Sequence, residues 1–285
     1  MNKIIISSDS TIDLSPELIK ANDIILLPLK VTLGTKTYSD GIDISPDDIY
    51  EYNAKTGELP KTAATNVGDA IEFFGEMTKN GDTLIHFSLS SEMTSSYNNC
   101  CIAASEFDNV YVIDSRNLST GGGLLVLKAA ELVKAGLDAE TIVEKINELA
   151  LRVDASFVIN SLDYLYKGGR CSALSVLGAN LLKLKPCIEV KNGAMGVGKK
   201  YRGKYADVLK EYVAERLADK DDIDLDRVFV THSGGDSQPV DEIVKLVKET
   251  LPFKEVYVTR AGCTISSHCG PNTLGVLFIR KTPLN

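Results

Sequence analysis

The sequence predicts an α/β protein made of two α/β domains, because strand and helix patterns alternate along it and the alternation changes near its middle. In the first half, short buried-strand runs are separated by helical stretches, which is typical of a parallel sheet built from crossover units. In the second half, Asn192-Gly193 joins two extended runs and indicates antiparallel pairing. We therefore expect a parallel-sheet domain over residues 1–150 and a mixed-sheet domain over residues 151–285.

Each predicted element rests on the spacing of its apolar residues. Strands in the first half are predicted over Lys3–Ser7, Asp23–Leu33, Asp82–Phe87 and Asn109–Ile113. Helices in the first half are predicted over Val67–Met77, Thr94–Ala104, Gly122–Ala135 and Ala139–Val153. Within the second strand, Pro28 indicates an edge or a bend, because proline cannot donate to a ladder.

The second half continues with more strands than helices. Its strands are predicted over Ser156–Asn160, Lys185–Val190, Arg227–Thr231, Glu255–Thr259 and Leu274–Ile279. Its helices are predicted over Tyr205–Ala218 and Val240–Thr250.

Composition excludes several classes of protein. The formal net charge of −8 argues against a general attraction to nucleic acid or to an anionic membrane. The first apolar run is too short for a signal peptide, and no run approaches the ~18 apolar residues of a membrane span. The six cysteines form no CxxC pair, so we expect reduced thiols, no metal site and no cofactor. These features predict a cytoplasmic protein with no stable membrane insertion.

Polar clusters follow several of the predicted strands, at the ends where ligands collect in open α/β sheets. They are Asp9-Ser10-Thr11, Ser88–Tyr97, Asp114-Ser115-Arg116 and the segment His268-Cys269-Gly270-Pro271 before the last strand. Helix capping explains any one of them. Together on one rim they would form a cradle of uncharged donors suited to a carboxylate or phosphate oxygen.

The three histidines are interpreted differently. His86 lies inside a strand and is interpreted as structural, while His232 is left undecided. His268 is the candidate ligand, because Gly270-Pro271 predicts a tight loop that would hold its ring in place.

Several motifs resemble the DegV family in order and spacing over nearly the whole chain. They are Asp9-Ser10-Thr11, Asp40-Gly41, Asp114-Ser115, Lys167-Gly168-Gly169-Arg170, Leu184-Lys185-Pro186, His268-x-Gly270-Pro271 and Leu274-Gly275. The resemblance implies a two-domain α/β protein that holds one long-chain fatty acid of 14–18 carbons, such as palmitate. It also implies a bacterial lipid carrier that serves an ATP-dependent fatty-acid kinase as its partner.

By the same resemblance, Thr62, Thr94 and His268 are the residues that bind the fatty-acid carboxylate, with Ser10, Ser95 and Arg170 nearby. Thr94 stands where the family carries serine and Ser95 where it carries glycine, and Thr62-Ala63-Ala64-Thr65 lacks the Gln-Pro half of the family's Thr-Ser-Gln-Pro segment. Neutral donors hold a carboxylate without the desolvation cost of a buried salt bridge. Candidate walls for the apolar tail are Leu124, Leu125, Val158, Ile159, Leu162, Leu165, Leu177, Leu181 and Leu182.

A basic segment runs from Lys183 to Lys204, with seven lysines and arginines against one acid, Glu189. It is interpreted either as a solvated hairpin face or as a docking surface for an acidic kinase partner. By resemblance, Arg202 is the docking candidate, and Lys200 lies two residues before it.

An autonomous enzyme is the alternative. The sequence contains no P-loop, GxSxG, HExxH or GxGxxG motif. A hydrolase or phosphotransferase that uses Asp9, Ser10, Thr11 and His268 remains open, although no nucleophile and base can be assigned among them. The chain also lacks a basic recognition helix, which argues against a DNA-binding regulator. We expect a carrier and not an enzyme.

Overall fold

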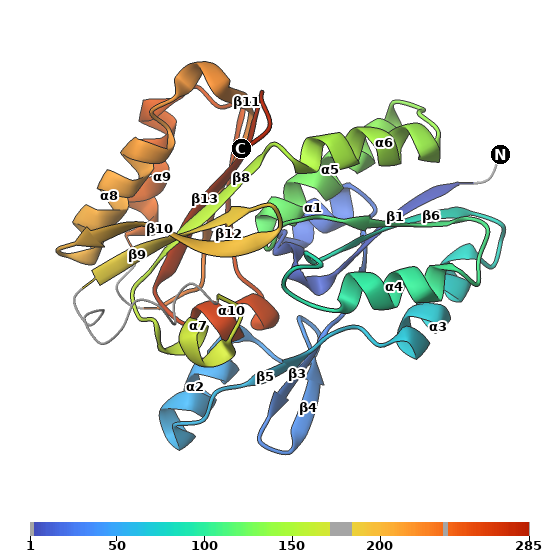
Figure 1. Ribbon diagram of the computed structural model, residues 1–285, viewed down its shortest axis with the longest axis horizontal. Helices are drawn as coiled ribbons and strands as arrows, with labels where there is room; N and C mark the ends of the chain where they lie inside the picture. The colour runs from blue at the N-terminus through green and yellow to red at the C-terminus, as the bar shows by residue number, and fades with distance from the viewer. Residues whose placement is uncertain (1–2, 172–183, 236–238, 285) are drawn as a thin grey trace.

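The computed structural model describes residues 3–171, 184–235 and 239–284, which form three β-sheets with layers of helices around them (Figure 1). The first sheet has the strand order β2-β1-β6-β7, and all its pairs are parallel. Its strands are β1 (Ile4–Asp9), β2 (Ile25–Leu27), β6 (Thr83–Ser88) and β7 (Val110–Asp114). This confirms the parallel sheet predicted for the first half.

The second sheet has six strands in the order β10-β9-β8-β13-β11-β12. Its strands are β8 (Val153–Ile159), β9 (Leu184–Lys191), β10 (Ala194–Arg202), β11 (Ile223–His232), β12 (Glu255–Arg260) and β13 (Thr273–Arg280). Only β11 and β12 pair in parallel, so the predicted mixed sheet is confirmed. Asn192 and Gly193 both have positive φ, as a tight hairpin between β9 and β10 requires.

A third, small antiparallel sheet has the order β4-β3-β5, with β3 (Lys30–Leu33), β4 (Lys36–Ser39) and β5 (Lys61–Ala63). Its presence corrects the prediction of a single strand over Asp23–Leu33. The chain breaks at Pro28-Leu29, so that β2 joins the parallel sheet and β3 joins the small one. Pro28 therefore marks a bend between two sheets.

Helices separate and cover the two larger sheets (Figure 1). They are α1 (Pro16–Ala21), α2 (Pro46–Thr56), α3 (Val67–Thr78), α4 (Ser96–Ala104), α5 (Thr120–Lys134), α6 (Ala139–Ala150), α7 (Asp163–Gly168), α8 (Tyr205–Arg216), α9 (Val240–Thr250) and α10 (Cys263–Cys269). None of the helices in the described residues combines the length and the apolarity needed to cross a bilayer.

Alternating side chains on the strands define the layers. On β6, Leu84 packs with the residues of α3 and α4, while Ile85 and Phe87 point into a larger core. That larger core contains Leu124 and Leu125 of α5 and also takes in side chains from the six-stranded sheet. On the far side of that sheet, α8 and α9 cover a separate core. The α5–α6 layer is thus shared by both large sheets, and the predicted domain division at residue 150 stays a prediction.

The segment before β13 differs from its prediction. His268 lies in the last turn of a helix, α10, and not in a loop. Gly270 follows the helix with a φ of 69°, which suits a helix end where a side chain would be strained. Since α10 is only seven residues long and carries several polar residues, its apolar periodicity is too weak to be recognised in the sequence.

Candidate functional site

Two adjoining cavities lie where α10 meets the start of α5 and the six-stranded sheet. The polar cavity has about 820 Å³ of empty volume, its solvent-open part included. The apolar cavity has about 520 Å³ of empty volume on the same basis and is lined almost entirely by carbon. Leu118, Ile265 and His268 border both cavities. The pair therefore offers one polar end and one apolar end to a single elongated ligand.

The polar cavity brings together the three residues predicted to bind a carboxylate. Thr62 lies on β5, Thr94 lies in the loop before α4, and His268 lies on α10, and all three line this cavity. Ser95 and Arg170, predicted nearby, line it as well. Both Ser95 and Arg170 are exposed, so the cavity opens to solvent on their side.

His268 is held in an uncharged state. Its Nε2 lies 2.8 Å from the Thr62 hydroxyl oxygen. Burial lowers the pKa of His268 to about 4, and the positive charge of Arg170 acts in the same direction. At neutral pH the imidazole is therefore neutral and shares one hydrogen bond with Thr62 without placing a second cation beside Arg170.

The two glycines before Arg170 have separate roles. A Cβ added at Gly168 would lie 2.6 Å from Nδ1 of His268, so only glycine leaves room for the ring. Gly169 has a φ of 68° and turns the chain after α7, and Arg170 then donates a hydrogen bond to the Gly168 carbonyl at 2.7 Å. This turn brings the guanidinium to the mouth of the polar cavity.

The loop that carries Thr94 is anchored to two neighbouring elements, the end of β7 and the β9–β10 hairpin. The Ser91 hydroxyl donates to the Asp114 carboxylate at 2.5 Å. The Ser90 hydroxyl donates at 2.7 Å to the carbonyl of Gly193, at the tip of the β9–β10 hairpin. Thr94 follows directly, with its backbone N–H bonded to the Ser90 carbonyl at 3.2 Å. The Thr94 hydroxyl is therefore presented by a fixed backbone.

Asp9 supports this loop through its hydrogen bonds. Its carboxyl group is fully buried and accepts the backbone N–H of Leu89 at 2.7 Å, at the start of the same loop. It also accepts the Thr11 hydroxyl at 2.6 Å and the Thr11 N–H at 3.0 Å. Burial raises the pKa of Asp9 above its ordinary value. The Asp9 and Thr11 groups of the alternative enzyme hypothesis are thus bonded to each other and to the loop backbone.

Asp40 holds the start of α10. It is 3% exposed, and its two carboxylate oxygens accept the backbone N–H groups of Cys263 at 2.8 Å and Thr264 at 2.9 Å. Ser10 donates to the same carboxylate at 3.2 Å. Ser10 is not among the residues that line the polar cavity, but it contacts the cavity wall indirectly, through Asp40 and through the backbone N–H of the lining residue Leu29, from which it accepts a hydrogen bond at 3.1 Å. Sequence reasoning missed this function of Asp40, because residues 40 and 263 lie far apart in the chain.

Asp13 forms a second link to α10. One of its oxygens accepts the backbone N–H of Gly262 at 2.8 Å, and the other bonds to the hydroxyl of Ser119 at the start of α5. Burial raises the pKa of Asp13 to about 8, with the nearby charges of Asp40 and Asp9 acting in the same direction. Asp13 is therefore largely protonated at neutral pH.

We expect this protonation to make the free energy of unfolding fall as the pH rises from 6.5 to 8. In this range unfolded Asp13 has already lost its proton while folded Asp13 keeps most of it until the pH nears 8, which costs at most about 1.4 kcal/mol per pH unit. The unfolded forms of His86 and His268, whose folded pKa values are lowered to about 3 and 4, lose their protons around pH 6.5, which opposes this slope at the lower end of the range. Urea unfolding at pH 6.5, 7.2 and 8 measures the slope.

Asp13→Asn supplies the matched variant for this prediction. The amide keeps an acceptor for Gly262 and a donor for Ser119 but does not titrate. Its unfolding free energy should fall less steeply over this pH range than that of the parent protein. An equal slope in the two proteins would contradict the assignment of the proton to Asp13.

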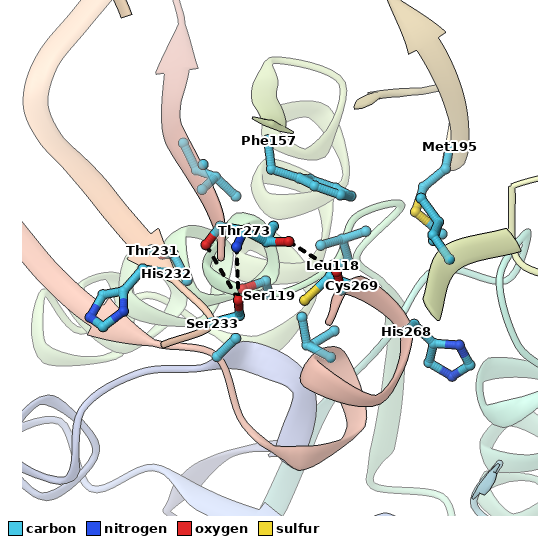
Figure 2. Close-up of a pocket in the computed structure, with 15 residues that line it drawn as sticks. Leu118, Ser119, Phe157, Met195, Thr231, His232, Ser233, His268, Cys269 and Thr273 are labelled. Atoms are coloured by element: carbon cyan, nitrogen blue, oxygen red, sulfur yellow. Dashed lines mark hydrogen bonds between the residues drawn. The ribbon is translucent and has the colours of Figure 1, made fainter. Parts of the chain in front are cut away.

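Figure 2 shows the apolar cavity, with Phe157 and Met195 on one side and His268 near the polar end. The hydroxyl groups around it are bonded to other protein groups. Ser233 and Thr273 exchange hydrogen bonds, at 3.0 Å for the bond from the Thr273 N–H. The Thr231 hydroxyl lies 2.6 Å from that of Thr120. Because these oxygens have partners, the cavity is left with methyl, methylene and ring surfaces.

Few of the candidate walls for an apolar tail line the apolar cavity. Leu165 lines it, as predicted. The other described candidates pack elsewhere in the core and do not line it: Leu124, Leu125, Val158, Ile159 and Leu162. The remaining candidates, Leu177, Leu181 and Leu182, lie outside the described residues. Phe157 and Met195 were missed, because an apolar residue in a strand has the same pattern whether it faces a core or a cavity.

The basic segment is only partly neutralised. Lys199 pairs with Glu211 at 2.8 Å and also with Glu215 on α8. Lys200 and Arg202 are exposed on β10, the edge strand of the six-stranded sheet. Lys183 lies outside the described residues. The exposed cations thus belong to the strand that carries Met195 to the apolar cavity.

Comparisons with known proteins agree with this architecture. The family model described as "Uncharacterised protein, DegV family" matches residues 3–281. A DegV domain-containing protein of Caldanaerobacter subterraneus subsp. tengcongensis is 31% identical over 99% of this chain and 100% of its own length.

Solved structures give the same result. A fatty-acid-binding DegV family protein from Thermus thermophilus is 27% identical, with a TM-score of 0.91 over 98% of this chain and 99% of that one. A stearic-acid-binding protein from Eubacterium ventriosum is 29% identical, with a TM-score of 0.84 over 99% of each chain.

The fold is that of an α/β protein with two large sheets and one small one, and it holds two adjoining cavities, one polar and one apolar. The extent of the family match identifies it further. The chain belongs to the DegV family.

Proposed function

We propose that this protein binds one long-chain fatty acid of 14–18 carbons, with the tail in the apolar cavity and the carboxylate in the polar cavity. The observation that carries the proposal is the junction of the two cavities at Leu118, Ile265 and His268. It gives an apolar slot with uncharged hydrogen-bonding groups at one end only. The fatty-acid-binding proteins from Thermus thermophilus and Eubacterium ventriosum, which share the fold, support the same ligand class.

Burial of the tail provides most of the affinity in this proposal. Each methylene removed from water contributes about 0.8 kcal/mol, so a tail of palmitate length binds tightly wherever most of it fits. The carboxylate needs only to stay hydrogen-bonded. Thr62, Thr94 and His268 supply uncharged partners for it, and Arg170 supplies a positive charge at the mouth.

We further propose that the bound carboxylate is presented to an ATP-dependent fatty-acid kinase in the cytoplasm. A carboxylate oxygen would attack the γ-phosphorus of ATP, forming acyl phosphate and releasing ADP. The solvent-open side of the polar cavity, where Ser95 and Arg170 are exposed, supports access from outside. Arg202 and Lys200 are the docking residues in this proposal, because exposed cations steer an acidic partner or the phosphates of its nucleotide.

Protein purified from a bacterial host is expected to carry about one equivalent of a 14–18-carbon fatty acid without any being added. The sample is denatured and extracted, and the extract is quantified by mass spectrometry against the protein concentration. Absence of stoichiometric fatty acid, together with no binding of added palmitate, would overturn the proposal.

Two controls make the result specific. Thr94→Val, which removes the hydroxyl but keeps the shape, should retain less fatty acid than Thr94→Ser, which keeps the hydroxyl. Incubation of the loaded protein with ATP alone should form no acyl phosphate. Turnover without a partner would favour the autonomous enzyme over the carrier.

A further inference from the structure

Thr264 is the second residue of α10 and lines the polar cavity together with Thr62, Thr94 and His268. The residue is 4% exposed. Its hydroxyl oxygen is buried and has no hydrogen-bond partner among the described residues. A buried polar group without a partner is rare in folded proteins, since its lost hydration is not recovered. The hydroxyl of Thr264 therefore calls for an explanation.

The neighbouring hydroxyls on α10 behave differently. Ser266 donates to the carbonyl of Ala261 at 3.1 Å, and Ser267 donates to the carbonyl of Cys263 at 2.7 Å. Such bonds back to the main chain are the ordinary way for a helical serine or threonine to satisfy its hydroxyl. Thr264 makes no such bond among the described residues, and it is the one α10 hydroxyl that borders the polar cavity.

The backbone of Thr264 is fixed, although its hydroxyl has no partner in the part of the chain that the structure describes. Its N–H donates to the Asp40 carboxylate at 2.9 Å, and the preceding N–H, of Cys263, donates to the same group at 2.8 Å. The side chain is therefore attached to a rigid point at the edge of the cavity. A donor held in this way loses little conformational freedom when a ligand arrives.

We propose that the Thr264 hydroxyl is a further ligand-binding group of this site and donates a hydrogen bond to a carboxylate oxygen of the bound fatty acid. This inference rests on the proposed function and adds a residue to it. A carboxylate accepts about four hydrogen bonds, so it has room for this donor beside Thr62 and Thr94. Thr62 already bonds to His268, and Thr94 to Ser96 at 3.2 Å. Thr264 donates without giving up an existing bond.

The test uses Thr264→Val, which replaces the hydroxyl by a methyl group of similar shape. The dissociation constant for palmitate is expected to rise about tenfold, as for loss of a hydrogen bond to a charged group. The melting temperature of the delipidated variant should equal or exceed that of the parent, because a buried unpaired hydroxyl has been removed. Thr264→Ser should restore palmitate affinity.

Thr65→Val is the matched control. The Thr65 hydroxyl is also buried and without a partner among the described residues, but Thr65 does not line the polar cavity. Its removal should leave the palmitate dissociation constant unchanged. A second ligand, 1-hexadecanol, separates the carboxylate contact from general damage, since Thr264→Val should weaken palmitate more than the alcohol.

The outcomes are distinct. If the parent protein binds palmitate and Thr264→Val binds it equally well, the inference is overturned while the proposed function stands. If Thr264→Val lowers the affinities for palmitate and for 1-hexadecanol equally, the inference is also overturned. An effect that does not depend on the carboxylate indicates altered packing. If the parent binds no palmitate, the proposed function itself fails and the inference fails with it.

Discussion

Replacing Ile265 with tryptophan is expected to abolish the binding of long-chain fatty acids while the protein remains folded. Ile265 lies on α10 and borders both the polar and the apolar cavity, so we expect a tail that extends from one to the other to contact it. An indole ring at this position would occupy the junction. If about ten methylenes are excluded from the apolar cavity, the binding free energy falls by about 8 kcal/mol, which is most of the binding free energy of such a ligand.

Palmitate binding is measured by calorimetry and folding by the melting temperature of the delipidated protein. The melting temperature should change little, because the larger side chain has empty space to enter. Ile265→Leu keeps the volume and should bind palmitate normally. Retained affinity in a folded Ile265→Trp variant would show that the tail takes another path.

Among the substitutions proposed for this protein, Asp40→Ala is expected to lower the free energy of unfolding most. The buried carboxylate accepts bonds from Cys263, Thr264 and Ser10, and removing it leaves two backbone N–H groups of α10 without partners. The free energy of unfolding should fall by roughly 3–5 kcal/mol, given hydrogen bonds to a charged group and the burial of the unpaired donors. Urea unfolding measures this loss.

Fatty-acid binding should fall in parallel, because α10 carries the imidazole of His268 and the junction residue Ile265. Asp47→Ala is the matched control, since Asp47 on α2 also contacts the region before α10 through Arg260 at 3.0 Å. That pair is exposed, with the Asp47 side chain 73% exposed, and its loss should cost less than about 1 kcal/mol. Similar losses in both variants would contradict the anchoring role of Asp40.

Local patterns in the sequence predicted the two larger sheets and the position of most helices. The helix over Val240–Thr250 is confirmed with the same bounds, because its apolar residues recur at helical spacing without interruption. The resemblance to a known family indicated Thr62, Thr94 and His268, and the structure brings these distant residues to one cavity. The helix pattern lies in one short stretch of chain, whereas the resemblance rests on motifs spread over nearly the whole of it.

The rest of the site depends on contacts that no short stretch contains. The hydrogen bond between Asp40 and Cys263 joins residues 223 positions apart, and no pattern in either segment indicates that the two are in contact. In the sequence, Thr264 is one more polar residue near the end of the chain. Only the structure shows that its hydroxyl is buried and has no partner among the described residues. Phe157 is an ordinary strand residue whose cavity-facing side follows from sheet packing.

The contact between Gly168 and His268 limits how the polar cavity can change. On the side of Gly168 there is no free space beside the His268 ring, since even a methyl group at residue 168 would overlap Nδ1. A head group larger than a carboxylate therefore has to extend the other way, toward the exposed side chains of Ser95 and Arg170. A variant selected to bind a ligand with a larger head group should therefore carry its substitutions around Ser95 and Arg170 and keep Gly168.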